Sequence, residues 1–116
     1  MIIGAHMMIQ TRNEAADRRF FTDVLKLPSV DAGDGFLIFA VPAGELAAHE
    51  SDKNDVHEIY LMCDDIASFV ADMKRQKIAC TEPENQGWGT LTRLTLPGGG
   101  RLGVYQPHHA RPKARA

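Results

Sequence analysis

Cysteine is scarce in this sequence of 116 residues, which contains two, Cys63 and Cys80. They stand in apolar surroundings without Cys-x-x-Cys spacing, a pattern that favours buried thiols over a disulfide, a zinc site or a redox pair. A dominant charge is also missing, because 13 basic residues oppose 15 acidic ones. The sequence therefore has no electrostatic footprint for nucleic acid or an anionic membrane, and small-molecule or protein partners are favoured.

Long apolar runs are absent as well. No stretch approaches the roughly 20 apolar residues that cross a bilayer, and no basic-then-apolar segment precedes the first strand signal. We therefore expect a soluble, cytoplasmic protein. The chain does have 44% apolar residues in a length common for one domain. This predicts a single domain over residues 1–107 and a flexible basic tail without periodicity over residues 108–116.

The first half of the chain predicts a strand, a helix and a hairpin in that order. An apolar stretch over residues 2–10 precedes Thr11 and Glu14, a capping-box signature that predicts a helix start near Thr11. Apolar positions then recur every three or four residues until Pro28, which predicts a helix over about residues 13–26. Two apolar runs, 36–41 and 45–50, flank a turn sequence and predict a hairpin.

The second half repeats this order after a polar linker. Residues 57–63 predict a strand, and Asp65 can cap a helix over about residues 66–77. Strands predicted near residues 91–96 and 101–106 are joined by Pro97-Gly98-Gly99-Gly100. The duplication predicts an α+β fold of two tandem βαβββ modules, about residues 2–50 and 56–107, which form curved mixed sheets with the helices outside.

This doubled module resembles the vicinal oxygen chelate superfamily, which includes glyoxalase I, extradiol dioxygenases and bleomycin-binding proteins. The resemblance rests on His6-Met7-Met8-Ile9-Gln10 before the first helix, on residues 58–65 before the second, and on residues 96–106 at the end. It covers residues 2–107. It implies two half-barrels around a concave pocket, a homodimer, and a divalent metal that supports Lewis-acid chemistry of a lyase or dioxygenase-like kind.

The same resemblance implies four metal-ligand positions, at His6, Ala47, Glu58 and Gly103. Alanine and glycine have no donor atoms in their side chains, so His6 and Glu58 remain as ligands, with His49 as a further candidate. Glu58 is also the candidate catalytic base. The missing donors leave two alternatives open: a non-catalytic protein that sequesters a small molecule beside a degenerate metal site, and a structural dimer without a ligand.

The two-residue period of a strand assigns the side chains to faces. Glu58, Tyr60 and Met62 are predicted to face the cavity, whereas the odd-numbered residues 59, 61 and 63 face the helices. The same period places Arg93 on the concave face, where its guanidinium can bind a carboxylate or phosphate, or pair with Glu58. The candidate substrate-binding residues are Met8, Phe36, Tyr60, Met62, Trp88, Arg93 and Tyr105.

Two of these candidates have further interpretations. Trp88 stands between two glycines, a pattern typical of a mobile lid or of a turn held by a buried indole. Tyr105 lies at a position equivalent to His49 in the repeat, and both also fit a packing role.

Overall fold

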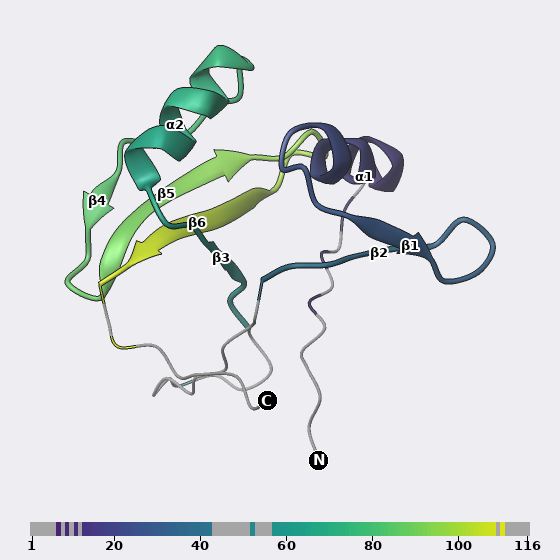
Figure 1. Ribbon diagram of the computed structural model, residues 1–116, viewed down its shortest axis with the longest axis horizontal. Coiled ribbons are helices and arrows are strands. Elements are labelled where there is room, and N and C mark those ends of the chain that lie inside the picture. The colour runs from purple at the N-terminus through teal and green to yellow at the C-terminus, as the bar shows by residue number, and fades with distance from the viewer. Residues whose placement is uncertain are drawn as a thin grey trace.

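The computed structural model describes residues 7, 9, 11, 13–42, 52, 57–108 and 110. In this part of the chain the strands form a two-stranded sheet, β1-β2, and a four-stranded sheet of order β3-β6-β5-β4 (Figure 1). The predicted α+β class is confirmed, and neither sheet closes into a barrel within the described residues. The elements, in order, are α1 (Glu14–Asp23), β1 (Ser29–Asp31), β2 (Leu37–Phe39), β3 (Tyr60–Met62), α2 (Ile66–Arg75), β4 (Glu84–Asn85), β5 (Gly89–Thr95) and β6 (Arg101–Pro107).

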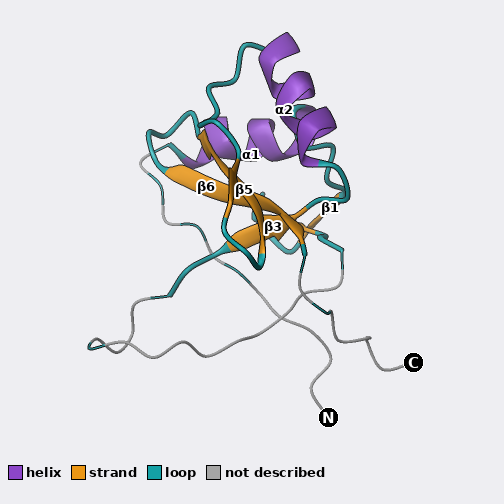
Figure 2. Cartoon of the chain, turned by 90° about the vertical axis from the view of Figure 1, so that its left-hand side faces the viewer, coloured by secondary structure: helices purple, strands orange, loops and turns teal. Residues whose placement is uncertain are grey.

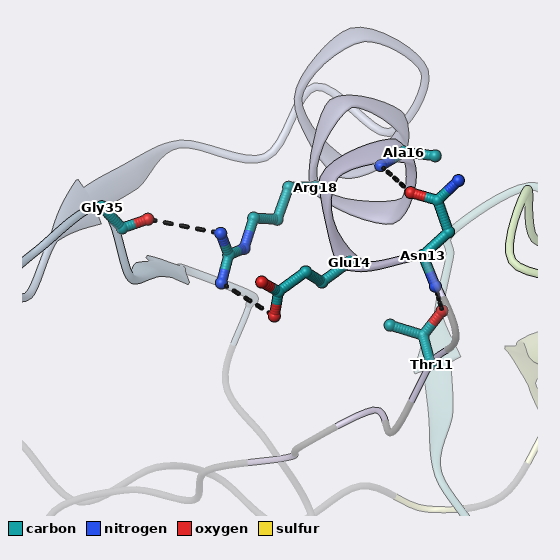
Figure 3. A network of polar contacts seen from close by, with 6 residues as sticks. All are labelled: Thr11, Asn13, Glu14, Ala16, Arg18 and Gly35. Carbon is teal, nitrogen blue, oxygen red and sulfur yellow. Dashed lines mark hydrogen bonds and ion pairs between the residues drawn. The ribbon is translucent and has the colours of Figure 1, made fainter.

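Helix α1 is capped by Asn13, and the predicted cap at Thr11 is wrong. The Asn13 side chain accepts a hydrogen bond from the backbone N–H of Ala16 at 3.1 Å, while the Thr11 hydroxyl accepts one from the N–H of Asn13 at 3.1 Å (Figure 3). Asparagine is among the best N-cap residues, so it displaces threonine from that role. The helix ends at Asp23, earlier than predicted, and Lys26 takes a left-handed φ of 58°.

Helix α2 begins as the sequence predicts. Asp65 accepts a hydrogen bond from the N–H of Ser68 at 3.1 Å, and this contact lowers the pKa of the Asp65 carboxyl. The N–H of Ile66 donates to Gln106 Oε1 at 2.9 Å, which attaches the start of the helix to β6. No helix in the described part of the chain is long and apolar enough to cross a membrane.

The hydrophobic core lies between the helices and one face of the four-stranded sheet. Figure 2 shows both helices on the same side of the strands. The partly buried Cys63 and Cys80 pack against this core, and burial raises the pKa of both thiols. The buried residues of the hydrophobic core are Phe20, Met73, Leu94, Leu96, Leu102 and Val104.

Strand β1 is an element that the sequence analysis missed. It pairs with β2 in antiparallel register, with Ser29 opposite Phe39, and the hairpin projects away from the four-stranded sheet (Figure 1). Its signal was the Ala-Gly-Asp-Gly sequence at residues 32–35, in which Gly33 and Gly35 adopt positive φ values. The partner predicted for β2, residues 45–50, lies outside the described residues, as does most of the strand predicted over residues 2–10.

The second half of the chain has the order β3-α2-β4-β5-β6, which is one βαβββ unit. Strand β3 is shorter than predicted, and β4 was not predicted. The glycine-rich connection between β5 and β6 is a tight turn, in which the N–H of Leu96 donates to the carbonyl of Gly100 at 2.8 Å. The tandem duplication itself stays a prediction, because most of the strand predicted over residues 2–10 and all of that predicted over residues 45–50 lie outside the described residues.

Candidate functional site

The face of the four-stranded sheet that points away from the helices carries several of the predicted site residues. Leu102 and Val104 of β6 belong to the core, so the alternate residue Gly103 lies on the opposite, concave face. Gly103 is paired with Tyr60 of β3 on one side and with Arg93 of β5 on the other. Paired residues share a face, so Tyr60 and Arg93 lie on this face on either side of a glycine.

The face predictions for β3 and its flanks agree with this arrangement. Ile59, Leu61 and Cys63 pack against the core, as the two-residue period predicted. Met62 is half-buried and is paired with Tyr105 of β6. Tyr105 is paired in turn with Leu91 of β5. Met62, Tyr105 and Leu91 therefore form a cross-strand row beside the row of Tyr60, Gly103 and Arg93.

Three aromatic rings meet on the concave face and form what we term the aromatic cluster: Tyr60, Trp88 and Tyr105. All three pairs are edge-to-face, with centroid separations of 6.1 Å for Tyr60–Trp88, 5.9 Å for Tyr60–Tyr105 and 5.0 Å for Trp88–Tyr105. Such T-shaped pairs are favourable contacts. Trp88 remains 41% exposed, so the cluster presents an aromatic surface to solvent.

Two glycines make room for the tyrosine rings. A Cβ on Gly103 would lie 2.5 Å from Cδ1 of Tyr60, and one on Gly89 would lie 2.7 Å from Cδ2 of Tyr105. Each ring therefore lies directly on the backbone of the neighbouring strand, where any larger residue would collide with it. Position 103, one of the four implied metal-ligand positions, is thus covered by the Tyr60 ring.

The segment around Trp88 is a tight hairpin turn between β4 and β5. The N–H of Gln86 donates to the carbonyl of Gly89 at 2.8 Å, and Gly87 donates to Asn85 Oδ1 at 2.8 Å. The Trp88 carbonyl accepts a hydrogen bond from His108 at 2.8 Å. The turn is held at several points, and its indole is half-exposed rather than buried because it packs against the two tyrosines on the open face.

Arg93 is half-buried and its backbone is fixed on both sides by Thr81. The N–H of Arg93 donates to Thr81 Oγ1 at 2.9 Å, and the Arg93 carbonyl accepts from the N–H of Thr81 at 3.0 Å. A pocket of about 140 Å³ lies beside it. Leu91, which is paired with Tyr105, is part of its wall, so the pocket adjoins the aromatic cluster. The lining consists of Thr81, Glu82, Glu84, Gln86, Leu91, Arg93 and Arg101.

The charges of this pocket are not paired with one another. Among the described residues the ion pairs are Glu14–Arg18 and Asp72–Arg75, so neither Arg93 nor Arg101 forms an ion pair with another described side chain. Glu84 accepts a hydrogen bond from Gln86 instead, at 3.3 Å. The guanidinium of Arg93 can therefore donate hydrogen bonds to a planar anion.

Glu58 and Phe36 are not part of the aromatic cluster. Glu58 is exposed, in the irregular segment before β3, and forms no ion pair with Arg93. Phe36 is 43% exposed and lies against Arg18, whose guanidinium carbon is 5.7 Å from the ring centroid. His6, Met8, Ala47 and His49 lie outside the described residues.

Sequence reasoning missed Glu84 and Arg101 in the pocket wall. Arg101 could have been predicted from the strand period. Residues 101, 103 and 105 lie opposite residues 95, 93 and 91 in the hairpin, so the side chains of both sets share one face of the sheet. Glu84 could not have been predicted in this way, since a two-residue strand carries no periodic pattern.

The residues present do not fit the four-ligand metal site that the fold family implies. Ala47 and Gly103 supply no donor atom, and the Tyr60 ring covers the backbone at Gly103. Glu58 is exposed, and the described part of the chain holds no group of three His, Cys, Asp or Glu side chains that could bind a metal ion. Two of the four implied positions are therefore unable to take part, whatever His6 and His49 contribute.

The four-stranded sheet therefore has its helices on one face and the aromatic cluster with Arg93 on the other, an α+β architecture. No protein-family model and no curated protein matches the sequence. Solved structures do match. An antibiotic binding protein, TnmS3, from Streptomyces sp. CB03234 has a TM-score of 0.63 at 15% identity, covering 92% of this chain and 98% of its own.

Two further solved structures extend this result. A lactoylglutathione lyase from Agrobacterium tumefaciens has a TM-score of 0.62 at 15% identity, with 91% of this chain and 92% of its own covered. A member of the glyoxalase/bleomycin resistance protein/dioxygenase superfamily from Sphaerobacter thermophilus has a TM-score of 0.58 at 18% identity, with 91% and 96% covered. The chain has the vicinal oxygen chelate fold, as its sequence predicted.

Proposed function

We propose that the chain is a binding protein for a planar, acidic small molecule, held on the concave face between the aromatic cluster and Arg93. The observation that carries this proposal is the set of three edge-to-face rings, one of them 41% exposed, beside a half-buried arginine that is not ion-paired with another described residue. A planar ligand would stack on the indole and direct its anionic group to the guanidinium.

Preorganisation supports this function. The rings contact one another before a ligand arrives, and the Arg93 backbone is hydrogen-bonded to Thr81 on both sides. Groups that are already ordered lose less conformational freedom on binding, which raises affinity. Leu91 lies between the rings and Arg93 and supplies an apolar floor.

The fold is compatible with binding and with catalysis, since one neighbour is described as an antibiotic binding protein and another as a lyase. A metal-dependent reaction would need His6 and Glu58, with His49, to hold the ion alone. We favour binding because two of the four implied ligand positions lack donors, whereas the aromatic cluster and Arg93 form a complete surface for a planar anion.

Trp88 provides the direct test, because it is the single tryptophan of the chain. Its indole N–H gives one resolved signal in a ¹H–¹⁵N spectrum. Titration with naphthoate should shift this signal saturably, whereas naphthamide should bind about tenfold more weakly and naphthylmethylammonium more weakly still, because they lack the anionic group. Equal shifts with all three probes would show that Arg93 does not contribute to binding. If none of the probes shifts the signal, the proposed binding function is contradicted.

We also propose that the protein acts as a homodimer. Within the described residues, strands β3 and β4 form the edges of the four-stranded sheet, and an edge strand offers backbone groups to a second copy. Sedimentation at micromolar concentration should give twice the monomer mass. A monomer alone would refute this part of the proposal without affecting the binding face.

A further inference from the structure

A second cleft lies on the opposite side of the four-stranded sheet from the aromatic cluster. It has a volume of about 290 Å³ and is lined by residues 7, 9 and 11, by α1, by β2 and its flanking residues, and by the helix-facing side of the four-stranded sheet. Its walls include Phe21 of α1, Phe39 of β2, Leu61 of β3 and Leu102 of β6. Leu102 points to the face opposite Gly103, so this cleft is separate from the proposed binding face.

The cleft contains a buried carboxylate with one oxygen unpartnered. Asp17 of α1 is 3% exposed, and its Oδ1 accepts a hydrogen bond from the N–H of Gly98 at 3.0 Å. Its Oδ2 is buried and has no hydrogen-bond partner in the described part of the chain. Burial of an unsatisfied polar atom is unfavourable. Because Asp17 is among the residues that line the cleft, a ligand donor that reaches this oxygen would remove the penalty.

The nearby arginine is already engaged. Arg18 forms an ion pair with Glu14 at 3.4 Å and donates to the carbonyl of Gly35 at 3.4 Å (Figure 3). Its guanidinium also lies over the ring of Phe36. Among the described residues, the charged groups that line the cleft are Glu14, Asp17 and Arg18, two carboxylates and one cation.

We propose that this cleft is a second binding site, which takes a protonated amine carried on an apolar body. The ammonium group would donate to Asp17 Oδ2, and the apolar body would lie against Phe21, Phe39, Leu61 and Leu102. The volume suits a ligand smaller than a typical drug molecule. An ammonium group is favoured over a neutral donor because it adds the attraction between opposite charges to the hydrogen bond with the carboxylate.

Three probes of equal chain length test the proposal: hexylammonium, hexanol and hexanoate. Their binding to the wild-type protein is followed through the backbone amide signal of Gly98, which donates to the same carboxylate. Hexylammonium should shift this signal saturably and bind about tenfold or more tightly than hexanol, and hexanoate should not bind. If hexanol or hexanoate binds as well as hexylammonium, or if none binds, Asp17 serves only to hold the glycine turn and the proposal is refuted.

A matched pair of variants assigns the effect to one carboxylate. Asp17→Asn keeps an oxygen for Gly98 and should reduce hexylammonium binding to the level of hexanol. Glu14→Gln removes a carboxylate that lines the same cleft but is paired with Arg18, and should change the affinity less than about threefold. Equal losses in both variants would refute the assignment to Asp17. The comparison of the three probes needs no variant, so it decides the proposal even if Asp17→Asn does not fold.

Discussion

Substitution of the glycine beneath the Tyr60 ring, Gly103→Val, is expected to abolish naphthoate binding and to lower the free energy of unfolding by about 1–3 kcal/mol. A Cβ at this position would lie 2.5 Å from Cδ1 and 2.8 Å from Cε1 of Tyr60, so the ring must leave the sheet. Its edge-to-face contacts with Trp88 and Tyr105 would be lost with it. Near-ultraviolet circular dichroism would detect the loss of the ring contacts, chemical denaturation would give the free energy of unfolding, and titration with naphthoate would show the loss of binding.

Gly100→Val is the matched control for this substitution. Gly100 lies in the turn that precedes β6, and a Cβ there would meet no atom within 4 Å. The control should therefore retain the aromatic signal and naphthoate binding. The double variant Tyr60→Ala with Gly103→Val should lose less stability than the sum of the two single variants, because the collision is already absent. Full additivity would contradict the account of this contact.

Charge reversal at Arg93 is also expected to have a large effect on ligand affinity. Arg93→Glu should weaken naphthoate binding about a hundredfold, since it replaces an attractive charged contact with a repulsive one. The fold should be retained, because the backbone of Arg93, rather than its side chain, makes the hydrogen bonds to Thr81. Calorimetric titration would give the affinity, and a thermal melt would check the fold.

Arg101→Glu is the control, because it reverses an exposed charge in the wall of the same pocket. Exposed charges are screened by solvent and salt, so this change should weaken binding less than about tenfold. If the two arginine variants lose the same affinity, the anion is attracted by the general charge of the pocket and Arg93 has no particular role.

Local signals in the sequence were sufficient to predict much of the fold of the second half of the chain. Asp65 caps α2 as predicted, because an aspartate before an apolar helix pattern can satisfy the first N–H groups by itself. The alternation around β3 placed Ile59 and Leu61 on the core side, because the strand period is fixed by backbone geometry. These features depend on neighbours in sequence, so one sequence predicts them.

Very short strands and competing helix caps were harder to predict. Strands β1 and β4 have three and two residues, and their pairing is decided by the strand beside them rather than by their own pattern. The cap of α1 was placed at Thr11 because Thr11 and Glu14 match a capping box, whereas Asn13, a stronger N-cap residue, caps the helix in the structure.

The candidate site was likewise predictable only in part. The face of Tyr60 and Arg93 followed from period two, but the meeting of Trp88 with Tyr60 and Tyr105 did not, since it depends on the β4–β5 turn. Gly103 was recognised in the sequence as a missing metal ligand. The structure adds a physical reason for glycine at this position, which is the room that the Tyr60 ring needs.

The central claim is that a planar acid binds to the aromatic cluster and Arg93 without a metal ion. Its most direct test is calorimetric titration of naphthoate into the wild-type protein in the presence of EDTA, and again after EDTA is removed and zinc or manganese is added. We predict the same affinity in both conditions, with one molecule bound per chain. Binding that occurs only with the metal, and that is lost in His6→Ala and Glu58→Gln, would contradict the claim and would instead support metal-dependent chemistry at those residues.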